Sequence, residues 1–181
     1  MIPAASPGQE TSVRQECKKL SFQALQTAHS GNHCAAEQLY LRIVRTKTCV
    51  FGAQSVETAA SHNALGELYV KMNRLAEAES EFMTAVGIRS RAGPDHVFDA
   101  AVSRENLAQV YEMTRRILAA KNMRLLGAPN KILCAYYYCP RAVLSIVQLS
   151  TCGQCKAVFY CSDACQLKDW KPRHKRFCKA M

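Results

Sequence analysis

The pattern of apolar and polar residues between positions 56 and 90 repeats with the period of an α-helix. A first helix is predicted from about Val56 to Met72, since one of its faces carries Ala60, Asn63, Ala64 and Leu68. Asn73-Arg74 then makes a short turn, and a second helix is predicted from about Leu75 to Ser90. Gly93-Pro94 breaks the chain after it. The pattern therefore predicts an antiparallel pair of helices.

This helix pair is the middle unit of an internal repeat with a period of forty-two residues. NALGELY (Asn63–Tyr69) aligns with ENLAQVY (Glu105–Tyr111) at that offset. Small residues and rings recur at the same offset, at Ala24, Gly66 and Ala108, at Ala36, Ala78 and Ala120, at Tyr40 and Phe82, and at Tyr69 and Tyr111. Small residues let two helices approach closely, and rings fill the space beside them. Three antiparallel helix pairs are therefore predicted.

The middle unit resembles a tetratricopeptide repeat. Its residues match the pattern L-G-x2-Y…A-x3-F…A of that family at Leu65, Gly66, Tyr69, Ala78, Phe82 and Ala85. The long period is similar to that of the kinesin light chains, and the resemblance covers roughly residues 18–127. It implies an all-α helical repeat whose exposed inner face binds other proteins.

The last helix of the repeat, at about Arg115–Leu126, departs from the pattern. It contains no acidic residue, and Arg124 stands where the other units suggest a ring. We therefore expect this helix to pack against something other than another repeat.

Charge and cysteine content divide the chain into two parts. Residues 1–113 carry eleven Lys/Arg and twelve Asp/Glu, whereas residues 114–181 carry thirteen and two. Seven of the ten cysteines lie between Cys134 and Cys178. The predicted organisation is a disordered leader, a helical-repeat domain, a linker and a cysteine-rich module, at residues 1–16, 17–127, 128–133 and 134–178.

The chain contains no targeting or membrane signal that we recognise. No run of about eighteen apolar residues occurs, and the N-terminal stretch MIPAASPGQETS lacks the basic start and apolar core of a secretion signal. We expect a cytoplasmic or nuclear protein with no membrane contact. In such reducing compartments, cysteine pairs more often bind metal than form disulfides.

Four closely spaced pairs of ligand residues occupy the C-terminal part: Cys134-x4-Cys139, Cys152-x2-Cys155, Cys161-x3-Cys165 and His174-x3-Cys178. Each spacing lets one short segment offer two ligands to one ion, and eight ligands complete two tetrahedra. Thiolates with one imidazole favour zinc, so two zinc ions are predicted. Spacing leaves open which pairs combine. Three cysteines stand singly and are predicted to be buried apolar residues, Cys17, Cys34 and Cys49.

The stretch C-x2-C-x5-C-x3-C-Q-x3-W-x3-H-x3-C, from Cys152 to Cys178, resembles the MYND zinc finger, and the resemblance covers residues 134–178. It implies an interleaved arrangement, in which one zinc is bound by Cys134, Cys139, Cys161 and Cys165 and the other by Cys152, Cys155, His174 and Cys178. The first pair encloses four residues instead of the two usual in the family.

A short helix is predicted inside this module, capped by Ser162 or Asp163 and ended by Pro172. Gln166 and Trp170 lie four residues apart and so share one helix face. The family resemblance implies that this face borders a groove for proline-rich peptides, with Gln166 and Trp170 as peptide-binding residues.

The function predicted from these features is that of a zinc-binding adaptor, with one protein-binding surface on the repeat and another on the finger. We expect no enzymatic activity, because no catalytic constellation occurs and both zinc sites are saturated by protein ligands. Specific nucleic-acid binding is not expected, since the thiolates offset part of the basic charge. The alternatives are a nucleic-acid-associated regulatory zinc protein and a RING-like ubiquitin ligase component.

Overall fold

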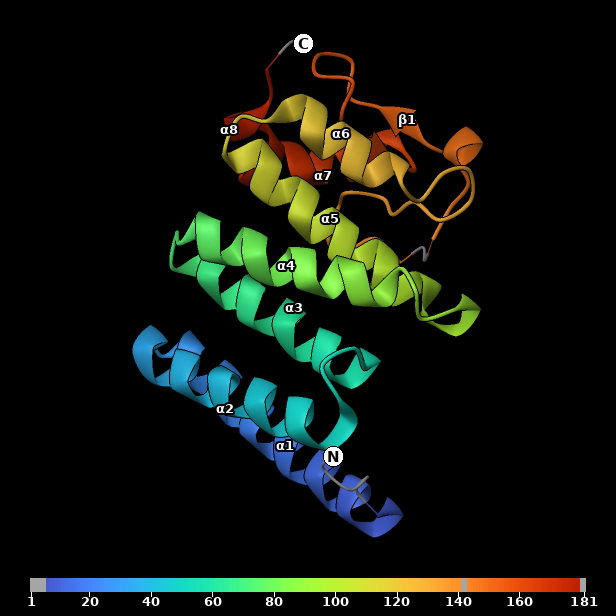
Figure 1. Cartoon of the computed structure of the whole chain (residues 1–181). Coiled ribbons are helices and arrows are strands. Elements are labelled where there is room, and N and C mark those ends of the chain that lie inside the picture. Colours follow the sequence, from blue (N-terminus) through green and yellow to red (C-terminus); the bar gives the residue numbers. More distant parts are fainter. Residues whose placement is uncertain (1–5, 141–142, 180–181) are drawn as a thin grey trace. The chain divides into compact units, whose positions relative to one another are not determined.

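The computed structural model describes residues 6–140 and 143–179 and divides into two compact units, residues 1–91 and 92–181 (Figure 1). Residues 1–5 of the predicted leader lie outside the described residues. Within the described ranges, no helix is both long enough and apolar enough to cross a membrane.

Two helix pairs make up the first unit, from blue to green in Figure 1. Helix α1 (Pro7–His29) packs against α2 (His33–Phe51), and α3 (Val56–Lys71) packs against α4 (Leu75–Arg89). Helix α2 also packs against α3. The two helices predicted for the middle unit are confirmed to within one residue at their ends.

The small residues of the repeat lie where helices approach each other. Ala24, Ala36 and Ala78 are fully buried. A Cβ atom added to Gly66 would lie 2.7 Å from a ring carbon of Phe82, so only glycine admits this ring. The prediction that small residues and rings form the interface between paired helices is therefore confirmed at these positions.

The forty-two-residue period is also visible in the backbone. Helices α2, α4 and α6 (Ile117–Leu125) begin at His33, Leu75 and Ile117, which are spaced at that interval. The turn before each helix contains one residue with positive φ: Gly31 at 85°, Asn73 at 57° and Arg115 at 64°. Glycine adopts this conformation freely, whereas other residues are strained in it. Asparagine is tolerated in this conformation, so the turn is less favourable at Arg115 than at Gly31 and Asn73.

The second unit begins with the third helix pair, α5 (Val97–Met113) and α6, after a short 3₁₀ turn, η1 (Pro94–His96). The finger follows, with a 3₁₀ turn η2 (Ile146–Gln148) and two short strands, β1 (Ser150–Thr151) and β2 (Phe159–Tyr160). The strands pair antiparallel, with Ser150 opposite Tyr160 and Thr151 opposite Phe159.

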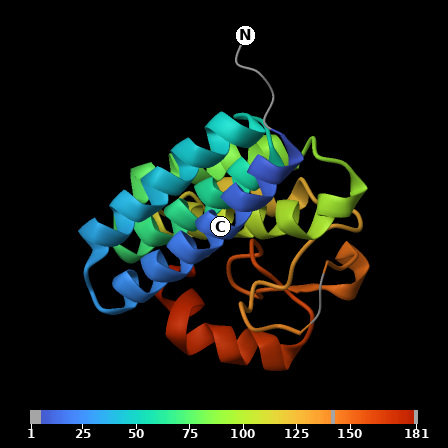
Figure 2. The ribbon, with the colours of Figure 1, turned by 90° about the horizontal axis from the view of Figure 1, so that it is seen from below.

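A helical stretch completes the finger, as Figure 2 shows in red. It consists of α7 (Asp163–Asp169), a π-helical turn η3 (Trp170–His174) and α8 (Lys175–Phe177). Ser162 caps α7 as predicted, because its side chain accepts a hydrogen bond from the Cys165 N–H. Pro172 does not end the helix as predicted, because the wider π turn takes up the proline within the helical path.

Helix α1 begins earlier than the sequence suggests. The predicted leader extends to residue 16, whereas α1 starts at Pro7. Ser6 and Gln9 form a reciprocal capping box, and Pro7 stands at the first helical position, where its missing N–H has no cost.

The single cysteines differ in burial. Cys17 is buried as predicted, but Cys34 and Cys49 are exposed. The prediction was wrong for these two because an isolated cysteine on an amphipathic helix carries no signal of the face on which it lies.

Candidate metal centres and the groove beside them

Two clusters of sulfur and nitrogen ligands form in the finger. Within each cluster the ligand atoms lie no more than 4.8 Å apart. The first cluster contains Cys134, Cys139, Cys161 and Cys165, and the second contains Cys152, Cys155, His174 and Cys178. All eight predicted ligands are thus brought together, in the interleaved pairing that the family resemblance implied.

The spacing of the ligand atoms fits tetrahedral zinc. A Zn–S bond of about 2.3 Å gives a tetrahedron with edges of about 3.8 Å between sulfurs, and a Zn–N bond of about 2.0 Å shortens the mixed edge to about 3.5 Å. The Sγ atoms of Cys139 and Cys161 are 3.6 Å apart, and those of Cys152 and Cys178 are 3.7 Å apart. Cys155 Sγ lies 3.5 Å from His174 Nε2. The two clusters are therefore compatible with two zinc ions.

Tight backbone turns bring together three of the four pairs of ligands. The Cys139 N–H donates to the Tyr136 carbonyl over 2.9 Å, and this turn brings both cysteines of the wide first pair to one site. Lys156 N–H donates to the Cys152 carbonyl over 3.0 Å in the second pair. In the fourth pair, the Cys178 N–H donates to the His174 backbone carbonyl over 2.8 Å, across one helical turn.

Backbone amides also favour the ionised form of a ligand. Burial opposes ionisation of the Cys152 thiol, but the N–H groups of Cys155 and Gln154 lower its pKa to about 7. A thiolate is the form that binds metal, so these amides favour the metal-binding form of Cys152.

A buried network of charged side chains joins helices α5 and α6 to the finger. Arg124, 2% exposed, makes two bonds to the Glu105 carboxylate, at 2.7 and 2.8 Å. Its Nη1 lies 2.6 Å from Glu112 Oε1 and donates to the Ala157 carbonyl over 3.0 Å. On the other side, Arg173 Nη1 lies 2.7 Å from Glu112 Oε2. The expectation that the last repeat helix packs against something other than a repeat is confirmed.

The network continues into the core of the finger. Arg173 also pairs with Asp169, whose carboxylate accepts a hydrogen bond from the Tyr160 hydroxyl at 2.7 Å. Burial alone would raise the pKa of Glu112, but the charges of Arg124 and Arg173 and its contact with His174 lower it to about 2. Glu112 is therefore ionised although it is only 1% exposed.

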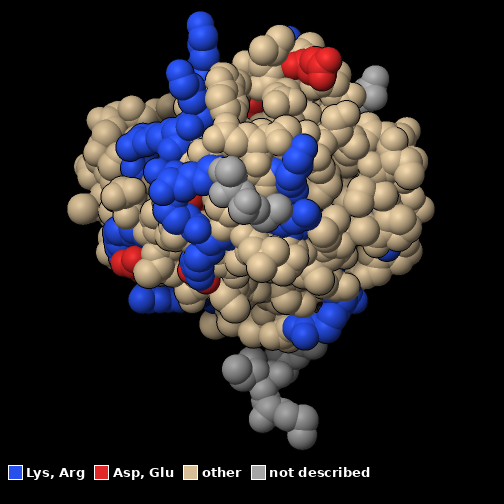
Figure 3. Space-filling view, turned by 90° about the horizontal axis from the view of Figure 1, so that it is seen from above, with Lys and Arg blue, Asp and Glu red and all other residues tan. Residues whose placement is uncertain are grey.

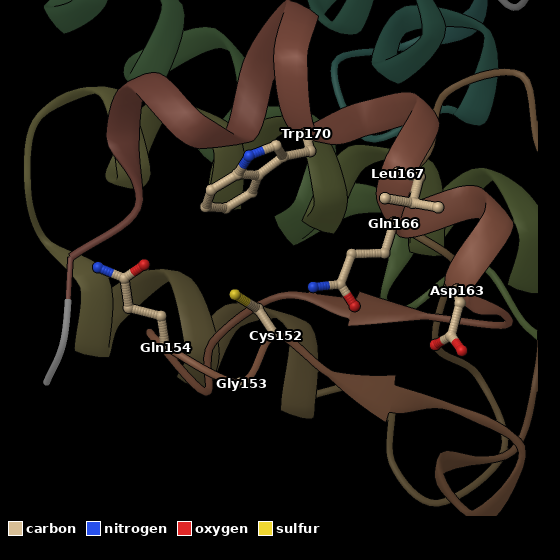
Figure 4. A pocket seen from close by; sticks show the side chains of 7 residues that line it. All are labelled: Cys152, Gly153, Gln154, Asp163, Gln166, Leu167 and Trp170. Atoms are coloured by element: carbon tan, nitrogen blue, oxygen red, sulfur yellow. The ribbon is translucent and has the colours of Figure 1, made fainter.

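A groove of about 450 Å³ opens beside the second cluster (Figure 4). Gln166, Leu167 and Trp170 line it from the helical side. The loop after β1 supplies the rest of the lining, with Cys152, Gly153 and Gln154, and Asp163 stands at one end. The structure thus places Gln166 and Trp170 in one groove, and it adds Leu167 and Gln154, which sequence reasoning missed.

The ion pair of Glu112 and Arg173 was also not revealed by the sequence. The two residues are sixty-one positions apart, and no spacing pattern links them. The sequence marked only Arg124 as unusual, because it stands where the other repeat units suggest a ring. This observation did not identify the partners of Arg124.

Comparison with known proteins agrees with the site. The family described as MYND finger matches residues 134–178. SET domain-containing protein 14 of Caenorhabditis elegans is 43% identical over 44 residues, which is 24% of this chain and 10% of that protein. N-lysine methyltransferase SMYD2 of Gallus gallus is 58% identical over 33 residues, 18% of this chain and 7% of that protein. Ubiquitin carboxyl-terminal hydrolase 19 of Arabidopsis thaliana is 61% identical over 28 residues, 16% of this chain and 4% of that protein.

These relatives correct one expectation. The sequence led us to expect no enzymatic activity, yet several proteins that share the finger are named as lysine methyltransferases. A finger saturated by its own ligands therefore does not argue against an enzyme. The similarity spans only the finger, and the chain covers at most 10% of these relatives, so it supports no activity for this chain either. What the geometry and the family match establish together is that residues 134–178 are a MYND finger with two ligand clusters compatible with zinc.

Proposed function

We propose that this protein is a zinc-binding adaptor whose finger binds proline-rich peptides in the groove formed by Gln166, Leu167 and Trp170. The observation that carries the proposal is the placement of an indole, an aliphatic side chain and an amide in one open groove. Aromatic planes are good seats for proline rings, and the polyproline backbone leaves its carbonyls free for an amide donor.

The indole is positioned by the metal site. The rings of Trp170 and His174 meet edge to face, with their centroids 5.6 Å apart. Trp170 also packs against the buried core of the finger. A platform held in this way loses little conformational freedom when a ligand binds, which favours affinity. The role of Trp170 in packing and its proposed role in binding are therefore compatible.

Leu167 indicates an interaction surface more clearly than Trp170, which also packs against the core of the finger. The Leu167 side chain is 72% exposed although it is aliphatic. It lies next to Gln166 on the groove side of α7. A proline-rich peptide would cover this apolar surface.

Trp170→Ala is expected to weaken the binding of a proline-rich peptide by roughly thirtyfold while both zinc ions are retained, since an aromatic anchor contributes about 2 kcal/mol. Leu167→Ala should weaken binding less and leave the fold unchanged, because this side chain lies mostly in solvent. Val147→Ala, at a position 88% exposed and outside the groove lining, is the matched control. Peptide affinity and zinc content are measured on the same preparations.

If Trp170→Ala loses zinc, the variant reports only the packing role of Trp170. The peptide affinity of Leu167→Ala then tests whether the groove binds the peptide. Peptide affinity of Leu167→Ala equal to that of Val147→Ala would contradict the proposal for the groove.

We also propose that the helix pairs are tetratricopeptide-like repeats that offer a second protein-binding surface. The forty-two-residue spacing of α2, α4 and α6 and the close fit of Gly66 to Phe82 support this identity. Three repeats are about the minimum number in proteins of this kind.

A basic surface supports nucleic-acid binding as the second candidate function. Figure 3 shows Lys and Arg gathered across one face, where Asp and Glu are few. Exposed basic residues among the described residues of the C-terminal part include Arg115, Lys168, Lys171, Lys175, Arg176 and Lys179. Phosphate contacts to such a surface would give affinity without sequence preference.

The two candidates differ in their response to salt and to substitution. If the finger is a peptide-binding module, duplex DNA and single-stranded RNA should bind only weakly at about 0.15 M salt, and Lys171→Glu with Lys175→Glu should not abolish peptide binding. Fluorescence anisotropy measures both. Tight nucleic-acid binding that the double substitution removes would favour the second candidate.

A further inference from the structure

Glu112 lies on α5, outside residues 134–178 that match the finger family. Its side chain is 1% exposed and is held by two cations, Arg124 at 2.6 Å and Arg173 at 2.7 Å. A buried carboxylate is expensive to desolvate and is tolerated where its partners compensate the charge. The position of this carboxylate is therefore well defined.

The ring of His174 lies between the second ligand cluster and this carboxylate. Its Nε2 faces the thiolates, 3.5 Å from Cys155 Sγ. Its Nδ1 is buried and has no hydrogen-bond partner among the described residues. Glu112 Oε2 lies 3.8 Å from that Nδ1. One ring nitrogen is thus directed to the metal site and the other to Glu112.

A neutral imidazole binds a metal through the nitrogen that carries no proton, so the proton must reside on the other nitrogen. A negative charge beside Nδ1 favours the tautomer with the proton there, and the Nε2 lone pair then remains available. Ligand histidines commonly direct their second nitrogen to a carboxylate for this reason.

We propose that Glu112 is a positioning residue for the second zinc site, which fixes the tautomer and orientation of His174 from outside the finger. The ligands are then complete within residues 134–178, but their full affinity requires α5. This inference rests on the ligand cluster alone and does not depend on what the groove binds.

The network around Glu112 explains how the helix pair and the metal site influence each other. Arg124 of α6 binds Glu112, Glu105 and the Ala157 carbonyl, the last of which lies two residues after Cys155. Ile117 of α6 packs against the same core that contains Cys152 and Cys155. Displacement of the α5–α6 pair would therefore withdraw the carboxylate from His174 and loosen the loop that carries two other ligands.

The test compares Glu112→Gln with Glu105→Gln in the full chain. Both variants remove one carboxylate charge from Arg124, but only Glu112 faces His174. Titration with Co²⁺ and back-titration with Zn²⁺ separate the two sites, since four thiolates and three thiolates with an imidazole give different absorption bands. Glu112→Gln should weaken the imidazole-containing site by about tenfold to a hundredfold, and leave the other site unchanged. Glu105→Gln should leave the affinity of both sites unchanged.

Equal losses in the two variants, or no loss in Glu112→Gln, would overturn the proposal. If Glu112→Gln prevents folding, ¹⁵N NMR of the His174 ring in the unmodified zinc protein tests the positioning role of Glu112 instead. The expected spectrum shows a proton on Nδ1 that exchanges slowly with solvent, and zinc on Nε2. Zinc bound to Nδ1, or a rapidly exchanging Nδ1 proton, would exclude a positioning role for Glu112.

Discussion

Removal of zinc with a chelator is expected to unfold residues 134–178 while helices α1–α4 remain folded. The finger has little regular structure to sustain it, since its two strands contain two residues each and its buried core is rich in ligand cysteines. Structural zinc sites in small domains contribute about 10–16 kcal/mol to folding at neutral pH. The first two helix pairs contain none of the eight ligands.

Helices α5 and α6 should respond differently from α1–α4. Ile117 packs against the core of the finger, and Arg124 donates to the Ala157 carbonyl. Zinc removal should therefore lower the protection of α5 and α6 from hydrogen exchange. Native mass spectrometry counts the ions, and hydrogen exchange followed by peptide mapping locates the loss of structure. A count of one ion or none would contradict the assignment of eight ligands.

A single substitution tests the same assignment. His174→Ala should lose one zinc ion and destabilise the finger, because a closed tetrahedron then lacks one ligand. His62→Ala is the control, since His62 pairs with Glu81 at 2.5 Å in the first unit and has no place in either cluster. Similar zinc content in the two variants would argue against His174 as a ligand.

Arg124→Met is expected to lower the free energy of unfolding by about 3–5 kcal/mol, because Glu105 and Glu112 would keep their buried charges without this partner. The Ala157 carbonyl would also lose its donor. Methionine retains most of the volume of the side chain, so the effect reports the loss of charge and hydrogen bonds rather than a cavity. Urea unfolding followed by circular dichroism measures the change.

Arg116→Met is the matched control, because Arg116 is exposed, lies over the Tyr111 ring at 4.4 Å and donates to the Thr114 hydroxyl over 3.0 Å, away from the buried ion network. An exposed substitution of this kind usually changes stability by about 0.5 kcal/mol or less. Addition of Glu105→Gln to Arg124→Met should recover part of the loss, since one unpaired charge is then removed. If Arg124→Met is no less stable than Arg116→Met, the ion network does not hold the two elements together.

The helix pairs and the metal ligands could be predicted because both depend on residues that are close in sequence. Helical periodicity repeats every turn, and the Gly66–Phe82 contact lies within one unit. Each ligand pair lies on one short segment, so its spacing is visible directly. The pairing of these segments into two clusters was available only through the resemblance to a family, because spacing by itself allowed several combinations.

Other features were predicted wrongly from the sequence, for physical reasons. The start of α1 depends on the capping box of Ser6 and Gln9, which competed with a composition typical of a disordered leader. The path through Pro172 depends on the π turn that the surrounding finger imposes. The expectation of no enzymatic activity rested on an absence of motifs, and relatives named as enzymes share the finger.

The sequence by itself determined the helix pairs, the eight metal ligands and the position of Gln166 and Trp170 on one helix face. It also marked Arg124 as anomalous, because a cation stood where the repeat requires a ring. Only the tertiary structure showed which groups Arg124 binds. Its partners Glu105, Glu112 and Ala157 come from two different elements, and Glu112 reaches His174 across sixty-two positions of the chain. Charge pairs of this kind follow no local period, so their partners are known only after α5, α6 and the finger have packed together.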